Sequence, residues 1–267
     1  NTAFYSGNAI LQDVRIEDSY FMNNPWSIYA YAPQQSDGSL VIQDNHFENN
    51  YYAAYFSYIT ELAFERNEIV DFRYMGLQLN TGITNSIVNA NSITGNGNQA
   101  LYLSNLGSSG EHRIFSNYLR TGPNSTSTLY ISGTGNVQAY HNTVVNSSLN
   151  SQSLAFGFDS SSSNISFLNN ICVADQGLAA YFQSLSHFDS GEYTHNLYYS
   201  SANNLVRLGT EFFSNSLAWN LSTGDQYSWF ENPLLEADTF IISPASPARN
   251  KGTNLAEASL DIMGNHR

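Results

Sequence analysis

The pattern of apolar and polar positions along this chain repeats about every 25 residues. Each unit holds a short apolar strand, then usually an asparagine, one further residue and another apolar residue. The phrase recurs in the segments 14–24, 40–50, 62–72, 86–96, 112–122, 137–147, 165–175 and 191–201. A period of this length with short strands is typical of one coil of a parallel β-helix, whereas a propeller blade needs about 40 residues.

A polar residue holds the centre of each phrase, and we expect these residues to form a ladder. The ladder positions are Ser19, Asn45, Asn67, Asn91, Asn117, Asn142, Asn170 and Asn196, separated by 22 to 28 residues. Asparagine can take a left-handed conformation at a sharp turn, and its side chain can hydrogen-bond along a column of identical neighbours. We therefore interpret these asparagines as scaffold rather than as ligand-binding residues.

Apolar side chains flank each ladder position at fixed offsets. Two residues after it lie Phe21, Phe47, Ile69, Ile93, Leu119, Val144, Cys172 and Tyr198. Three residues before it lie Ile16, Ile42, Phe64, Val88, Ile114, Ala139, Phe167 and Tyr193. In a solenoid each of these side chains stacks on its equivalent roughly 4.8 Å away, so the pattern predicts a core made of columns.

The repeated phrases resemble the pectin-lyase-like superfamily of right-handed parallel β-helices over roughly residues 10–205. The tail is similar to a phrase that closes many secreted bacterial β-helix repeat proteins, in residues 246–252 (SPARNKG) and 261–267 (DIMGNHR). The resemblance implies an all-β, right-handed parallel β-helix of about eight or nine coils with three short parallel sheets. We expect one domain over residues 1–267, with an incomplete N-terminal coil at 1–13 and an irregular C-terminal cap at 209–267.

A third strand follows each ladder position, and its outward residues form a row rich in tyrosine. Strict alternation predicts the outward column Tyr29, Tyr55, Gln78, Tyr102, Tyr130, Ala155, Tyr181 and Arg207. The resemblance implies that this face is the one on which related lyases, hydrolases and esterases hold glycan chains. Tyrosine suits that task, because a sugar stacks on the ring while the phenol supplies a hydrogen bond. The alternative, that the rings stack on one another and stiffen the sheet, has equal weight.

The amino-acid composition limits which partners and which cellular location we expect for the protein. The net charge is −13, and Lys251 is the sole lysine among nine Lys and Arg residues, so we do not expect nucleic acid to bind. Cys172 is the only cysteine, which excludes an internal disulfide and predicts a small buried hydrophobe. A lone cysteine fits bacterial secretion better than a disulfide-built ectodomain, and no apolar run approaches 18 residues. We expect a protein outside the cell or on its surface, without membrane insertion.

Residues with catalytic chemistry are few. Asp71 and Arg73 lie in the predicted loop after the third sheet and could border the groove, although an Asp-x-Arg pair is more often a loop ion pair. Glu111, His112 and Arg113 form a compact acid-base set, but strand alternation points them different ways. We expect no metal ion and no cofactor, and no cluster of carboxylates supports Ca²⁺.

Three functional hypotheses remain from the sequence. The first is an extracellular polysaccharide-binding or surface-display domain without catalytic activity. The second is a polysaccharide lyase or glycoside hydrolase acting on a uronic or other polysaccharide. The third is an adhesin stalk or assembly subunit, since residues 1–11 show no capping helix and an end-to-end partner or further coils could cover that edge.

Overall fold

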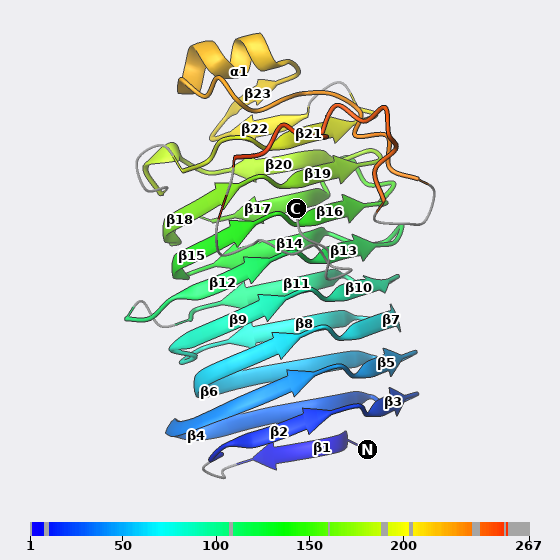
Figure 1. Cartoon of the computed structure of the whole chain (residues 1–267), viewed down its shortest axis with the longest axis vertical. Coiled ribbons are helices and arrows are strands. Elements are labelled where there is room, and N and C mark those ends of the chain that lie inside the picture. Colours follow the sequence, from blue (N-terminus) through cyan, green and yellow to red (C-terminus); the bar gives the residue numbers. More distant parts are fainter. Residues whose placement is uncertain are drawn as a thin grey trace.

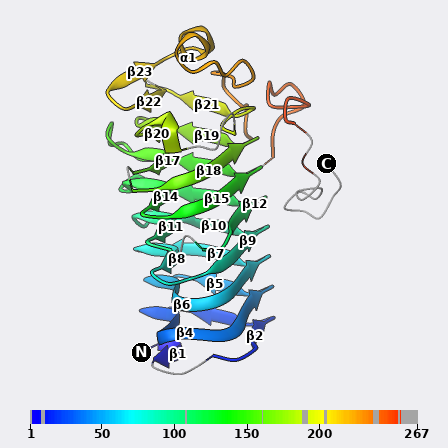
Figure 2. The ribbon, with the colours of Figure 1, turned by 90° about the vertical axis from the view of Figure 1, so that its left-hand side faces the viewer.

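Each repeat of the sequence forms one turn of a parallel β-solenoid of about 7 turns. The computed structural model describes residues 2–7, 11–106, 109–159, 161–187, 192–202, 205–236, 241–253 and 255, and the side chains of 33–37 and 187 lie outside that description. Strands of successive turns lie side by side on the same face of the solenoid (Figures 1 and 2). The sequence predicts eight or nine coils, whereas the structure has about 7 turns.

The strands lie on three faces, which we call A, B and C in chain order. Face A contains β1 (Thr2–Gly7), β8 (Met75–Asn80), β11 (Gln99–Ser104), β14 (Ser127–Ser132), β17 (Leu154–Phe158), β20 (Leu178–Phe182) and β22 (Val206–Leu208). Face B contains β2 (Val14–Glu17), β9 (Asn85–Asn89), β12 (His112–Phe115), β15 (Gly135–Tyr140) and β18 (Ser163–Leu168). Face C contains β3 (Tyr20–Met22), β5 (His46–Glu48), β7 (Glu68–Phe72), β10 (Ser92–Gly95), β13 (Tyr118–Thr121), β16 (Thr143–Asn146), β19 (Ile171–Ala174) and β21 (Leu197–Ser200).

Two long strands join faces A and B. β4 (Trp26–Gln43) and β6 (Tyr52–Glu65) run from face A through the corner into face B, so the two faces belong to one hydrogen-bonded sheet of 15 strands. Face C is a separate sheet of 8 strands. The sequence predicts three short sheets, and the structure has three faces but two sheets because these strands do not break at the corner.

The predicted asparagine ladder is present at the corner between faces B and C. Each asparagine from Asn45 to Asn170 donates from Nδ2 to the Oδ1 of the next, at 3.0 to 3.2 Å. The same Oδ1 accepts the backbone N–H of the preceding ladder residue, and Nδ2 also donates to a backbone carbonyl, as Asn117 does to Val88 at 2.8 Å. Ser19 begins the ladder through its backbone N–H, and the Ser228 hydroxyl ends it by accepting from Asn196. These asparagines are at most 3% exposed, so they are scaffold.

The left-handed residue at this corner is the one before each ladder position. Positive φ angles between 48° and 58° occur at Asp18, Asp44, Arg66, Ala90, Ser116, His141, Asn169 and His195. The expectation that the ladder asparagine itself turns the corner is wrong. Its side chain is committed to the neighbouring turns, and the preceding residue bends the chain although a left-handed conformation costs it about 1–2 kcal/mol.

The inward columns form the core as the offsets predict. In the column that follows the ladder, Phe47, Ile69, Ile93, Leu119, Val144, Cys172 and Tyr198 have no exposed surface. In the column that precedes it, the same holds for Ile42, Phe64, Val88, Ile114, Ala139 and Phe167. Burial raises the pKa of the Cys172 thiol, which fits a packing role.

The two ends of the solenoid differ. At the C-terminal end, β23 (Glu211–Phe213) pairs antiparallel with β22, and α1 (Ser216–Thr223) lays the fully buried Trp219 against Phe182 and Phe213. A short 3₁₀ turn, η1 (Leu185–His187), follows β20. At the N-terminal end the core residues Phe4, Val14, Ile16 and Phe21 are only partly buried. The end-to-end partner expected at this edge stays a prediction.

The ladder predicts an unequal response to substitution at its middle and at its end. Asn117→Ala leaves the Val88 carbonyl and two Asn91 donors without their partners, and each buried group left unsatisfied costs about 1–3 kcal/mol. We expect a destabilisation of about 3 kcal/mol or more, against about 1 kcal/mol for Ser228→Ala at the ladder end. Thermal and urea unfolding measure both, and equal losses would contradict the ladder's role.

Candidate functional site

The predicted tyrosine column lies in one file on the outer side of face A. Successive pairs are Cα partners in the parallel ladder, in the order Tyr5, Tyr29, Tyr55, Gln78, Tyr102, Tyr130, Gly157, Tyr181 and Arg207. The side chains from Tyr29 to Tyr130, and Tyr181 and Arg207, are partly exposed. The register therefore places the candidate residues together, whereas ligand binding by them stays a prediction.

The column departs from the sequence prediction at one turn. Ala155 is fully buried, and Gly157 occupies the position between Tyr130 and Tyr181. Ala155 and Gly157 lie two residues apart and therefore on the same side of β17, so the sequence predicts the side correctly but the register wrongly. Phe156 and Phe158 point inward, as alternation requires, and both are fully buried. Gly157 also leaves room for the Tyr130 ring, since a Cβ there would lie 3.1 Å from it.

The rings of the column contact one another as well as solvent. Tyr5, Tyr29 and Tyr55 stack nearly parallel, with centroids 5.6 and 4.9 Å apart. Because the stack follows the solenoid axis, each ring covers the face of the next, and the surface presents ring edges and hydroxyls. The ring planes of Tyr102 and Tyr130 are tilted by 42° to one another, with centroids 6.2 Å apart. These two rings therefore cover each other less than Tyr29 and Tyr55 do. The rings in the N-terminal part of the column therefore stack on one another, as the alternative interpretation expects. Stiffening of the sheet by this stack stays a prediction.

A second group of rings widens the N-terminal part of the column into a surface. Trp26 stacks on Tyr52 at 3.8 Å and meets Tyr29 edge to face at 5.2 Å. Beside them Tyr51 stacks on Tyr74 at 5.4 Å, and these two rings are 46% and 37% exposed. We call the whole set the aromatic platform: Tyr5, Trp26, Tyr29, Tyr51, Tyr52, Tyr55 and Tyr74.

Sequence reasoning missed five of the platform residues. Tyr5 lies in the turn before the predicted column begins, and it is the Cα partner of Tyr29. Trp26 and Tyr52 are the first residues of β4 and β6, and Tyr51 and Tyr74 lie just before β6 and β8. The alternation rule follows residues within a strand, so it does not reach the corner that precedes it. The recurrence of an aromatic residue three before Tyr29 and Tyr55 was the available signal.

A cavity of about 300 Å³ lies at the corner beside the platform, lined by Asn23, Asn24, Pro25, Tyr51 and Arg73. Arg73 donates from Nε to the Oδ1 of Asn49 at 2.9 Å. Asp71 turns this corner with a φ of 55° and is exposed. Arg73 therefore lies beside the platform, where it supplies a cation and hydrogen-bond donors. A catalytic role for Asp71 and Arg73 stays a prediction.

At the other end of the column Arg207 is held between aromatic rings. Its guanidinium carbon lies 5.0 Å from the centroid of Tyr181 and 5.6 Å from that of Phe212. Nε donates to the carbonyl of Gly209 at 2.7 Å. This hydrogen bond holds the Arg207 guanidinium over the rings of Tyr181 and Phe212, with which it makes cation–π contacts.

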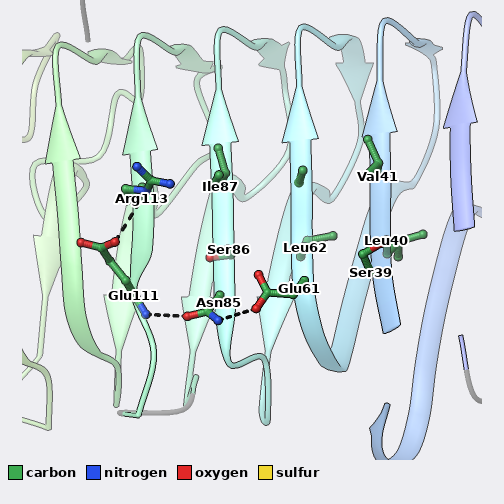
Figure 3. A pocket seen from close by; sticks show the side chains of 11 residues that line it. Ser39, Leu40, Val41, Glu61, Leu62, Asn85, Ser86, Ile87, Glu111 and Arg113 are labelled. Atoms are coloured by element: carbon green, nitrogen blue, oxygen red, sulfur yellow. Dashed lines mark hydrogen bonds and ion pairs between the residues drawn. The ribbon is translucent and has the colours of Figure 1, made fainter. Parts of the chain in front are cut away.

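The acid-base set at β12 divides between the core and the surface. His112 is fully buried, with Nδ1 at 3.0 Å from the Ser86 hydroxyl. Glu111 and Arg113 point outward on face B and form an ion pair at 3.7 Å (Figure 3). His112 therefore cannot meet the same substrate as its two neighbours, in agreement with strand alternation.

The part of the chain that the structure describes contains neither a candidate metal site nor a membrane-spanning helix. Within it, no three His, Cys, Asp or Glu side chains converge on a point that could hold a metal ion. None of its helices is long and apolar enough to span a membrane.

Two hydroxyls of the platform have a raised pKa. Burial, and then neighbouring tyrosines, raise the pKa of Tyr29 and of Tyr52 above the usual value of about 10. A raised pKa in the folded state means that stability is fully present below about pH 10 and falls as the pH rises through the folded values. We expect the thermal midpoint to fall above pH 10, and to fall less in a Tyr29→Phe/Tyr52→Phe double variant; an equal fall in both proteins would contradict this.

Comparison with known proteins adds no relative: no family model, no curated protein and no solved structure matches this chain.

Proposed function

We propose that the protein is an extracellular, non-catalytic solenoid that binds a neutral polysaccharide on the aromatic platform. The proposal includes the type of solenoid. The β-helix of this protein is right-handed and pectin-lyase-like, as in secreted bacterial proteins, and the repeated phrases and the closing phrase of the sequence support this. The partner is a glycan, and the protein works outside the cell or on its surface.

The aromatic platform is the observation that carries the proposal. Seven aromatic side chains gather on one outer face, where most outward positions of a soluble sheet are polar. Tyr51 and Tyr74 offer exposed rings for the apolar C–H face of a sugar. The stacked column beside them offers a row of phenol edges, whose hydroxyls can exchange hydrogen bonds with a hydroxyl-rich chain.

Charge favours a neutral glycan over a uronate. The protein carries a net charge of −13, which repels a polyanion at low ionic strength. Arg73 is the cation that lines the corner cavity, and it is already bonded to Asn49. A single arginine cannot neutralise the repeated carboxylates of a uronate chain.

The carboxylates singled out for catalysis do not share a site. Asp71 turns the corner between faces C and A, whereas Glu111 lies on face B and pairs with Arg113. Cleavage by a hydrolase requires two carboxyl groups about 5–9.5 Å apart across one bond. Asp71 and Glu111 therefore do not form such a pair, which favours the binding role over cleavage by these two residues.

The first test of the proposal removes the exposed rings. A Tyr51→Ala/Tyr74→Ala double variant should bind a neutral polysaccharide at least about fivefold more weakly, since each aromatic contact contributes about 0.5–1.5 kcal/mol. Affinity electrophoresis in gels that contain cellulose-, xylan-, mannan- or glucan-derived polymers measures this. Tyr20→Ala, which removes an exposed ring on face C, is the matched control and should bind as the wild type. Equal binding by both variants would remove the platform from the account.

The second test concerns chemistry. The protein is expected to release neither reducing ends nor unsaturated ends from neutral or uronic polysaccharides. Assays for both products over long incubations check this. Robust cleavage that Asp71→Asn or Glu111→Gln abolishes would replace the binding role by that of a lyase or hydrolase.

A further inference from the structure

The outer side of face B carries apolar side chains where polar ones are expected. Val41, Ala63 and Ile87 are Cα partners on β4, β6 and β9. Val41 and Ile87 point outward (Figure 3), and Ala63 takes the outward position between the buried Leu62 and Phe64. Along the same column they are bracketed by Arg15 on β2 and Arg113 on β12. The three side chains are partly buried and form the floor of a cavity of about 210 Å³.

A polar wall runs along one side of this floor. Asn85 donates from Nδ2 to Glu61 at 2.6 Å, and its Oδ1 accepts the backbone N–H of Glu111 at 3.0 Å (Figure 3). The Glu111 carboxylate, paired with Arg113 at 3.7 Å, closes the cavity at the far end. The wall thus presents two carboxylates to the cavity, and its amide is already engaged with its neighbours.

A second cavity of about 290 Å³ continues from Glu111 across the next turns, lined by Gly110, Glu111, Asn136, Gln138, Asn164 and Ser166. The amide of Asn164 donates to Asn136 at 2.9 Å, and that of Asn136 donates to the Gly110 carbonyl at 3.0 Å. The Oε1 of Gln138 is buried, and no donor among the described residues reaches it. Glu111 lines both cavities, and together they reach the size range of roughly 300–1,000 Å³ typical of ligand sites. We call them the face B groove.

The lining of the groove defines the chemistry of its ligand. Its acceptors include the carboxylates of Glu61 and Glu111 and the unpartnered Oε1 of Gln138, and its one cation, Arg113, is paired with Glu111. A wholly apolar ligand would strip water from these groups without replacing its hydrogen bonds, and an anion would meet two carboxylates. The apolar floor in turn favours a ligand with a flat C–H surface.

We propose that the face B groove is a second binding site, separate from the aromatic platform, for a short uncharged oligosaccharide. The C–H faces of its sugars lie on Val41, Ala63 and Ile87, and its hydroxyls donate to Glu61, Glu111 and Gln138. The site does not depend on the platform, because it lies on another face and is formed by other residues.

Nuclear magnetic resonance can follow both sites in one sample. In protein labelled at the isoleucine δ1 methyls and the tryptophan indoles, the Ile87 methyl reports on the groove and the Trp26 indole on the platform. Ile87→Val and Trp26→Phe variants assign the two signals. Titration with cellohexaose, xylohexaose, mannohexaose and laminarihexaose should shift the Ile87 methyl saturably with at least one of them. A Trp26 shift alone would support the platform and overturn the groove proposal, and an Ile87 shift alone would do the reverse.

Two conservative variants test whether the Glu111 carboxylate takes part in binding at the face B groove. Glu111→Gln keeps the shape of the groove but replaces a charged acceptor by a neutral amide, and the Ile87 titration should weaken about fivefold. Glu65→Gln removes a carboxylate from β6 on the same face without lining either cavity, and it should leave the titration unchanged. Equal effects of the two variants would overturn the assignment of Glu111.

Charged probes decide the ligand class. Oligogalacturonate and spermine, titrated under the same conditions, should leave the Ile87 methyl in place. A saturable Ile87 shift with either of them, and none with the neutral hexaoses, would overturn the uncharged assignment and identify an anion or a polyamine site instead.

Discussion

The structure depends on register between successive turns, and the asparagine ladder enforces that register. Each buried asparagine bonds to the turn above and the turn below through three groups of its own, its backbone N–H, Oδ1 and Nδ2. A slip of one residue between turns would leave several of these groups buried without partners, at about 1–3 kcal/mol each. One corner of the solenoid therefore aligns every other column, in the core and on the surface.

Register turns a repeated sequence position into a row on the surface, and the two candidate sites are two such rows. On face A the row is aromatic, and neighbouring rings stack along the axis, as Tyr29 does on Tyr55. On face B the row is apolar for three turns, at Val41, Ala63 and Ile87. In the next two turns it is polar, at Arg113 and Gln138. The ladder and the core leave both rows free to vary, because outward side chains take no part in either. A fixed scaffold with variable rows is a suitable basis for recognising an extended polymer.

Sequence reasoning reached the features that follow from the repeat itself. The ladder asparagines, the inward columns and the Tyr29 to Tyr130 file were predictable because each depends on one offset from one residue type. Corners were not predictable in the same way. The left-handed residue before each ladder position ranges from Asp to Ala and His, so its identity carries no signal. Gly157 in place of Ala155 depends on the register of β17 against β14, which alternation within one strand does not fix, and the face B groove depends on outward residues of separate turns.

The exchange of the asparagine side-chain amides with solvent tests the ladder most directly. If the turns lie in register, the Nδ2 hydrogens of Asn67, Asn91, Asn117 and Asn142 should exchange only when the solenoid opens, and far more slowly than those of the exposed Asn96 and Asn124. Nuclear magnetic resonance of the side-chain amides in heavy water measures this. Exchange of the ladder amides as fast as that of Asn96 and Asn124 would contradict the ladder and every column aligned by it.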